Sequence, residues 1–420
     1  MDLTFRDSLS GERRPVPRPT RGPLALYVCG PTVNDMAHVG HGRTYAYFDI
    51  VRRFYRDEGV AVRHVMNITD FEDKITARAR SLGLSWRTLA RREEARFRAD
   101  LAALRLLSPH LTPRASTFVP EMIRLIRRLE KLGRIVRDGD SWYYRTPEPH
   151  NPRNFPVGAE LAKHAVPEPG ETVEALDLVN RDFLVWRQQE PPAASWPSPW
   201  GNGAPGWHLE CFSMAERHLR IPVDLHGGGN DLLFPHHYAE NEIALALYDT
   251  PFSRHFLHTA FVTEDGRKMS KSIGNLVPLR AALDEAGPDA LRWYLLSRPY
   301  NTRLEWDGRG LETARREFEF LRTMLRTAIP DGAGGGLDPA ELKALVERVK
   351  LHIADGFAVE RAFGEVRLYA ERLGHDASGR FERGSGPSVR ALLRRLDRLT
   401  GLSFGNGTRP ISSRGGRRSG

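Results

Sequence analysis

The chain has 420 residues, of which 40% are hydrophobic and 27% charged, and it is long enough to form more than one domain. We expect a cytoplasmic protein without membrane contact, because no apolar run is long enough to span a bilayer and the N-terminus does not read as a signal peptide. A formal net charge of +9 suits a polyanionic partner such as RNA.

The first predicted strands and helix are typical of an α/β nucleotide-binding fold. Residues 1–22 are rich in arginine and proline and are predicted to be an extended lead-in. The apolar stretch Leu24–Val28 predicts a strand, and apolar residues at three-residue steps from Tyr45 to Phe54 predict the helix that follows it. A second strand is predicted over Val62–Ile68. This order matches the first half of a Rossmann-type sheet.

Most later segments are predicted to be helical. An insertion carries helical periodicity from Met122 to Leu132, followed by a proline-rich part without a clear period. Further helices are predicted at Leu279–Leu283, Ala290–Leu296, Leu311–Leu325, Pro339–Leu351 and Val389–Leu399. We therefore expect six parts: the lead-in at 1–22, a first Rossmann half at 23–110, a connective insertion at 111–200, a second Rossmann half with a lysine-containing loop at 201–275, a helical stem and bundle at 276–405, and a disordered basic tail at 406–420.

Two short motifs are suited to binding a triphosphate from two sides. His38, Gly40 and His41 lie where the first strand gives way to the helix, and the free N–H groups of a helix N-terminus favour an anion. Gly40 lets the backbone approach that anion, and both imidazoles can donate to phosphoryl oxygens. Lys268 and Lys271 can neutralise the charge that develops on a pyrophosphate leaving group. We predict catalytic roles for these histidines and lysines, and ATP contacts for Gly40 and Lys271.

The two cysteines of the chain are candidates for metal ligands. Cys29 closes the first strand, and Cys211 lies 182 residues further on, where a structural disulfide is not expected in a cytosolic protein. Pro235 is well placed to start a helix on which His236 and Glu240, four residues apart, share one face. Two thiolates, an imidazole and a carboxylate are a plausible ligand set for zinc, provided that the fold brings them together.

The phosphate motifs resemble the two signatures of the class I aminoacyl-tRNA synthetases, and within that class the chain is similar to the cysteinyl-tRNA synthetases. The similarity extends from about Leu24 to Arg326. Further matching segments are Asn67–Lys74, Asp182–Trp186, Ser195–Gly201, Gly206–Cys211 and Pro288–Arg292. The resemblance implies a Rossmann-type class I synthetase catalytic domain with a connective insertion, followed by an α-helical bundle. It also implies activation of L-cysteine with ATP and Mg²⁺ and transfer of the cysteine to tRNA(Cys).

The resemblance also implies a zinc site. In that family one zinc ion held by two cysteines, a histidine and a glutamate binds the thiolate of the substrate, which implies one Zn²⁺ per chain at Cys29, Cys211, His236 and Glu240. The glutamate has two candidates. Relatives follow the paired histidines directly with Glu-Asn-Glu, which points to Glu242, whereas the helical spacing from His236 points to Glu240. We predict Glu240, because the geometry of the site must be satisfied first.

Six further residues are candidates for substrate contacts. Gly228, within three consecutive glycines, lets the backbone pass close to adenosine, and Asp231 can accept hydrogen bonds from ribose hydroxyls. The resemblance implies that Trp207 walls a small pocket for the cysteine side chain. Candidates for the polar groups of the amino acid are Tyr27, Thr69 and His226.

Two other functions remain open. Bacterial relatives usually carry a small anticodon-contacting domain beyond the bundle, and we expect only a basic tail there. The related ligase of mycothiol synthesis, which joins cysteine to the amine of a glucosaminyl-inositol, is about this length. An inactive paralogue that binds RNA is the third alternative. Asp182–Phe183, His226 and the basic charge favour the tRNA ligase, which we expect to be a monomer.

Overall fold

The computed structural model describes residues 1–147, 153–155, 182–269, 274–327, 338–375 and 386–404. At its centre lies a parallel sheet with the strand order β10-β9-β3-β4. Its strands are β3 (Leu24–Val28), β4 (Val62–Met66), β9 (Leu225–Gly229) and β10 (Phe256–Thr259). Strands β3, β9 and β10 are almost entirely buried, as expected for a parallel sheet covered on both faces, whereas β4 begins with the partly buried Val62 and the exposed Arg63.

The strand order places a crevice beside β3. From β3 the chain continues through helix α1 (Val39–Asp57) to β4 on one side, whereas β9 and β10 lie on the other side. Ligands of open α/β sheets bind outside the carboxyl ends of the strands at such a change of direction. The residues that follow β3 and β9 are therefore expected at the functional site.

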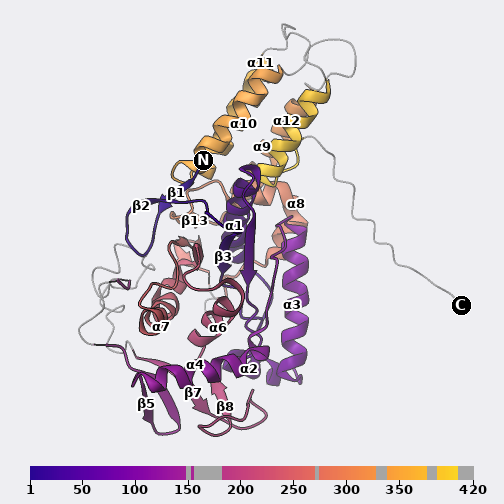
Figure 1. The fold of residues 1–420 in the computed structure, drawn as a ribbon. Coiled ribbons are helices and arrows are strands. Elements are labelled where there is room, and N and C mark those ends of the chain that lie inside the picture. Colours follow the sequence, from indigo (N-terminus) through magenta and orange to yellow (C-terminus); the bar gives the residue numbers. More distant parts are fainter. Residues whose placement is uncertain (148–152, 156–181, 270–273, 328–337, 376–385, 405–420) are drawn as a thin grey trace, which may run out of the picture.

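Three further sheets surround this centre. An antiparallel sheet with the order β5-β6-β7-β8 lies at the lower end of Figure 1, near α4. Its strands are β5 (Ile135–Asp138), β6 (Ser141–Tyr144), β7 (Phe183–Gln188) and β8 (Gly203–Pro205). The other strands are β1 (Leu3–Arg6) and β2 (Arg13–Val16), which pair antiparallel, and β11 (Val262–Glu264), β12 (Arg267–Lys268) and β13 (Leu304–Glu305), in the order β12-β11-β13.

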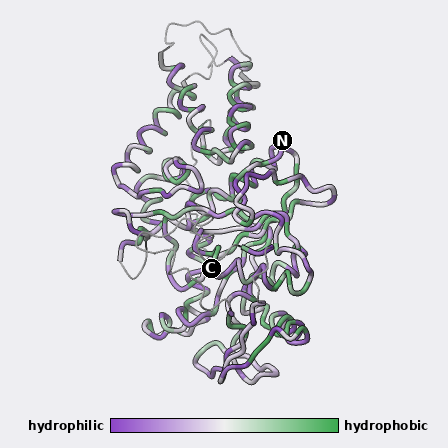
Figure 2. Tube along the Cα trace, turned by 90° about the vertical axis from the view of Figure 1, so that its left-hand side faces the viewer, coloured by the Kyte–Doolittle hydropathy of each residue, from purple (hydrophilic) through white to green (hydrophobic). Residues whose placement is uncertain are grey.

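Helices cover the sheets and form a bundle at the upper end of Figure 1. Beside the sheets lie α2 (Asp73–Ser81), α3 (Trp86–Ala103), α4 (Val119–Lys131), α6 (His208–Leu219), α7 (Tyr238–Tyr248) and the short turns η1 (Ala115–Thr117), η4 (Asn230–Leu232) and η5 (Leu233–His237). The stem and bundle contain α8 (Leu279–Leu295), α9 (Gly308–Thr327), α10 (Pro339–Ala354), α11 (Val359–His375) and α12 (Gly386–Thr400). Figure 2 shows hydrophobic and hydrophilic residues alternating along the bundle helices, which is typical of helices with one buried face.

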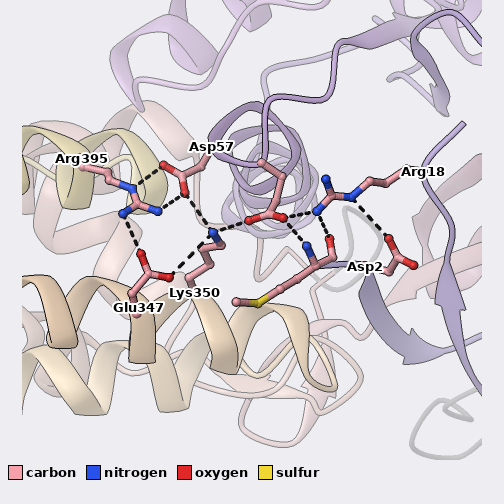
Figure 3. A network of polar contacts seen from close by, with 8 residues as sticks. Asp2, Arg18, Asp57, Glu347, Lys350 and Arg395 are labelled. Carbon is pink, nitrogen blue, oxygen red and sulfur yellow. Dashed lines mark hydrogen bonds and ion pairs between the residues drawn. The ribbon is translucent and has the colours of Figure 1, made fainter.

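A network of charged side chains joins the bundle to the end of α1 (Figure 3). Lys350 of α10 lies 3.7 Å from Asp57 and contacts Glu58, while Arg395 of α12 binds Asp57 at 2.8 Å and Glu347 at 2.7 Å. Both carboxylates at the end of α1 are largely buried. The bundle is therefore attached to the central sheet through the helix that starts at the phosphate motif.

The predicted strand at Leu24–Val28 and the helix after it are confirmed, and the second strand ends two residues earlier than predicted. The lead-in is not merely extended, because β1 and β2 pair within it and bury Leu3, Phe5 and Val16. The two helices predicted within 279–296 form α8, which is broken at Gly287 with a φ of 75°. Helix α11 was not predicted. The basic tail at 406–420 lies outside the described residues. No helix of the described part has the length and apolar character needed to cross a bilayer.

Candidate active site and metal centre

A cavity of about 690 Å³ opens at the carboxyl ends of the central strands. One wall is formed by the segment between β3 and α1, with Cys29 and His38, and by Gly40 and His41 in the first turn of α1. Other lining residues include Glu72, Lys74, Phe97, Trp207, Gly229, Asp231, Thr259 and Met269. The histidine motif and Met269 of the lysine motif therefore line one cavity, which lies where the strand order predicts it.

The histidine motif is organised around the start of α1. The backbone N–H of His38 donates to Nδ1 of His41 at 3.3 Å, and the two rings lie with centroids 3.9 Å apart. Because Nδ1 of His41 accepts this bond, a neutral His41 carries its proton on Nε2, where it can donate to a phosphoryl oxygen. A side chain at position 40 would place its Cβ 2.9 Å from the ring of His38, so the glycine allows that ring to keep its position.

The lysine motif is described only in part. The backbone of Lys268 ends β12, and Met269 is buried and lines the cavity. Lys271 lies outside the described residues. The base of the predicted loop is thus at the cavity.

The four predicted metal ligands lie together beneath the cavity. Ligand atoms of Cys29, Cys211, His236 and Glu240 are all within 4.8 Å of one another, and all four residues are buried. The two sulfur atoms are 3.7 Å apart. Among the described residues, Nε2 of His236 and Oε1 of Glu240 are buried without a hydrogen-bond partner, and they lie 3.5 Å apart. Unsatisfied buried donors and acceptors of this kind, beside two thiols, fit a bound metal ion.

Burial controls the charge of this group. It raises the pKa of Cys29, Cys211 and Glu240, and it lowers the pKa of His236. The protein environment alone thus favours the neutral form of each ligand. A divalent cation reverses this preference for the thiols and the carboxylate, because its charge stabilises the deprotonated forms.

The fourth ligand can be assigned by its neighbours. Oε2 of Glu240 lies 2.8 Å from Nε2 of His226, which leaves Oε1 facing His236. Glu242, in contrast, accepts a hydrogen bond of 2.6 Å from Nδ2 of Asn154 and does not belong to the cluster. The geometry therefore favours Glu240, as the helical spacing predicts.

Two histidines at this site were not singled out from the sequence. His237 places Nε2 3.3 Å from the sulfur of Cys29 and Nδ1 2.7 Å from Nε2 of His258. Together with His226, Cys29 and Glu240, His237 forms a second group whose ligand atoms are close enough to hold an ion. The paired histidines at 236 and 237 were visible in the sequence. His258, in contrast, is brought to the site by the pairing of β10 with β9.

The predicted substrate residues separate into two sets. Trp207 lines the cavity and its ring lies on that of His236, with centroids 4.2 Å apart and an interplanar angle of 21°. Asp231 also lines the cavity. Of the three consecutive glycines before it, Gly229 lines the cavity and the predicted Gly228 does not. A Cβ on Gly228 would collide with Leu232, so this glycine serves local packing.

The other three candidates lie behind the lining residues. Thr69 donates to Oε2 of Glu210 at 2.8 Å, and His226 contacts Glu240 and the carbonyl oxygen of Tyr27. The hydroxyl of Tyr27 is buried, and burial together with the nearby thiols raises its pKa. Tyr27 and His226 therefore lie beside the cluster, Thr69 is bound to Glu210, and none of the three lines the cavity in this structure.

Comparisons with known proteins agree with the fold and the site. Residues 17–316 match the family of the tRNA synthetases class I (C) catalytic domain. The chain is 37% identical over 426 residues to the cysteine–tRNA ligase of Anaeromyxobacter dehalogenans strain 2CP-1, covering 95% of this chain and 86% of that protein. It is 38% identical over 373 residues to the cysteine–tRNA ligase of Aeropyrum pernix, covering 87% and 75%.

A solved structure supports the same fold. Mycobacterium tuberculosis methionyl-tRNA synthetase in complex with methionyl-adenylate matches with a TM-score of 0.67 at 17% identity, covering 91% of this chain and 92% of that one. Together with the family match over residues 17–316, the parallel sheet and its cavity at the strand ends define a class I tRNA synthetase. Within that class, the chain belongs to the cysteinyl-tRNA synthetase family.

Proposed function

We propose that the chain is a cysteine–tRNA ligase, which activates L-cysteine with Mg-ATP to cysteinyl-adenylate and transfers the cysteine to tRNA(Cys). The observation that supports this most directly is the position of Cys29, which belongs both to the cavity lining and to the buried cluster. A small side chain that reaches the floor of the cavity therefore meets the metal ligands. Among the amino acids, a thiol side chain suits such a floor best.

Cys29, Cys211, His236 and Glu240 would hold one zinc ion per chain. When bound, zinc lowers the pKa of the substrate thiol and binds the resulting thiolate far better than the hydroxyl of serine. A pocket that relied on shape alone would gain only about 1–3 kcal/mol from a size difference of one small group. The chain fixes the orientation of its own ligands, since His226 contacts Glu240 and Trp207 stacks on His236.

The other end of the cavity would bind ATP. The carboxylate of cysteine attacks the α-phosphorus, the bond to the β-phosphate oxygen breaks, and pyrophosphate leaves with the electron pair. Nε2 of His41 would donate to a phosphoryl oxygen, with His38 beside it. Lys268 and Lys271 would neutralise the charge that develops on pyrophosphate. Asp231, at the end of β9, would accept from the ribose hydroxyls, as expected at the strand ends of a Rossmann-type sheet.

Pyrophosphate exchange tests the first half of this proposal. With cysteine and Mg-ATP the purified protein should exchange labelled pyrophosphate into ATP, and serine should be poorer by orders of magnitude. His41→Ala should lower the exchange rate far more than it weakens cysteine binding, because its interaction strengthens in the transition state. Equal exchange with serine and cysteine would contradict the proposed role of zinc.

The acceptor is tested on the same preparation. Total tRNA and glucosaminyl-inositol should be offered side by side with labelled cysteine. We expect charging of the tRNA that bears a cysteine anticodon and no transfer to the sugar amine. Transfer to the sugar amine alone would refute the tRNA ligase while leaving adenylate formation intact.

A further inference from the structure

Helix α3 carries a row of arginines on one side. Arg87, Arg91 and Arg98 are four and seven residues apart, which places them on one face of the helix, and all three are exposed. Glu94 lies in the same row, but it is only 3% exposed, and its carboxylate accepts from Arg98 at 2.7 Å and from Arg114 at 2.6 Å. The surface of this row is therefore cationic.

The row borders a hollow of about 120 Å³. Arg87 and Arg91 line it from α3, and Arg114 and Ser116 line it from the opposite segment. The remaining acidic group, Asp70, is 7% exposed and already accepts from the backbone N–H of Ser116 at 2.8 Å and from its hydroxyl at 2.6 Å. Glu94 is thus paired with Arg98 and Arg114, and Asp70 is bound to Ser116, so that neither carboxylate pairs with Arg87 or Arg91.

Two of the rim arginines have no anionic partner. Within the part of the chain that the structure describes, neither Arg87 nor Arg91 forms an ion pair, although most exposed arginines nearby do. The guanidinium of Arg87 lies over the ring of Trp86, 4.2 Å from its centroid. A guanidinium held by an aromatic ring, with its N–H groups free at a hollow, is suited to a bidentate contact with phosphate.

Helix α3 and the segment of residues 70–74 contribute to both the hollow and the active-site cavity, through different side chains. Phe97, on another face of α3, lines the cavity and packs edge-on against His41. Asp70 of the hollow precedes by a few residues Glu72 and Lys74, which line the cavity. Figure 1 shows α3 running along one side of the molecule from α8 to α2. A polyanion whose end enters the cavity can therefore reach the arginine row with neighbouring phosphates.

We infer that the hollow between α3 and Arg114–Thr117 binds a phosphodiester of the RNA whose 3′ end enters the cavity. The inference rests on the proposed function, because it names the surface that receives the acceptor end of the tRNA. Arg87 and Arg91 supply the charge, and Trp86 positions Arg87. These contacts strengthen RNA binding without a role in adenylate formation, which needs only ATP and the amino acid.

The double substitution Arg87→Gln and Arg91→Gln tests this inference in the full chain. We expect the KM for tRNA to rise about tenfold and the slope of log affinity against log salt to fall by about one for each arginine removed. Pyrophosphate exchange with cysteine should stay within about twofold of the unaltered protein, and this measurement also shows that the variant folds. Arg91→Gln alone, which loses no ion pair, should give about half of the change in slope.

A matched control removes two exposed arginines elsewhere. Arg13 and Arg361 border a separate hollow near β2, on the other side of the molecule from α3 (Figure 1). Arg13→Gln with Arg361→Gln makes the same change in net charge, also removes the ion pair of Arg13 with Asp355, and should leave the KM for tRNA nearly unchanged. An equal loss in both double variants, or no loss in the α3 variant while the unaltered protein charges tRNA, would overturn the inference alone. An unaltered protein that charges no tRNA would overturn the proposed function as well.

Discussion

At the scale of single residues, two glutamates of α7, Glu240 and Glu242, are the candidates for the fourth zinc ligand. Glu240 faces His236 and His226, and Glu242 is bound to Asn154. We predict that Glu240→Gln weakens zinc binding by more than the roughly 10–100-fold that loss of an outer partner costs, because a charged ligand is removed. Zinc per chain after dialysis, and the exchange ratio of cysteine to serine, would both fall. Glu242→Gln is the control, since glutamine can keep the bond to Asn154; loss of zinc in this variant alone would reverse the assignment.

The site residues that the sequence identified are those with a distinctive local context. Cys29 and Cys211 are the only cysteines of the chain, and His236 and Glu240 are related by helical spacing, so chemistry and periodicity were enough to find them. His258 could not be found in this way, because its contact with His237 depends on the long-range pairing of β10 with β9. Gly40 was expected to admit an anion. The structure shows a second reason for a glycine, because a Cβ at this position would lie 2.9 Å from the ring of His38.

At the scale of helices, a buried ion pair joins α1 to α8. Arg292 and Asp49 are 0% and 3% exposed, and Arg292 also donates to the carbonyl oxygen of Thr400 at 2.8 Å. We predict that Arg292→Met lowers the free energy of unfolding by about 3–5 kcal/mol, because a buried carboxylate loses a partner. Urea unfolding measures this loss. The same substitution at Arg367, whose pair with Glu371 is half-exposed, should cost about 1 kcal/mol or less.

The same pair gives the unfolding free energy an acid-dependent component. Burial raises the pKa of Asp49, but Arg292 and Arg53 outweigh it, so that the pKa lies below its usual value. A carboxyl group with a lowered native pKa stabilises the fold above its unfolded value of about 3.9, and this contribution is lost as the pH falls below that value. Arg292→Met should reduce the slope of stability against pH in this range. An unchanged slope would contradict the assigned role.

Helices with a regular apolar period were predicted best. The start of α8 and the position of α4 follow directly from their spacing. Helix α11 was overlooked although Val359, Phe363 and Val366 have helical spacing and are buried, so a stricter count of periods would have found it. The pairing of β1 with β2 was not visible, because arginine and proline dominate this segment and its few apolar residues become buried only by tertiary contacts.

At the scale of the whole molecule, the sequence predicted the class I fold but not how its parts are attached. The bundle meets the catalytic part at the end of α1, through charges that are far apart in sequence (Figure 3). Lys350 and Glu58, for example, are in contact across this junction. Such pairings are not encoded in local periodicity, since each partner by itself resembles an ordinary surface charge. The α1 helix consequently links the phosphate motif at its start to the bundle at its end.

Removing the central cation of this junction tests the attachment. Lys350→Met removes one cationic partner from Glu58 and one from Asp57. The side chains of these two residues are only 7% and 11% exposed. We expect a loss of about 1–3 kcal/mol in unfolding free energy, because a buried charged group loses a contact, and faster hydrogen exchange in α10 and α12. Pyrophosphate exchange should change little, since the cavity is built from the sheet edge and the start of α1.

Lys343→Met is the matched control, as this lysine is exposed on the same helix. If both variants lose stability equally, the effect belongs to α10 itself; if only Lys350→Met loosens α10 and α12, the junction charges hold the bundle against the catalytic part.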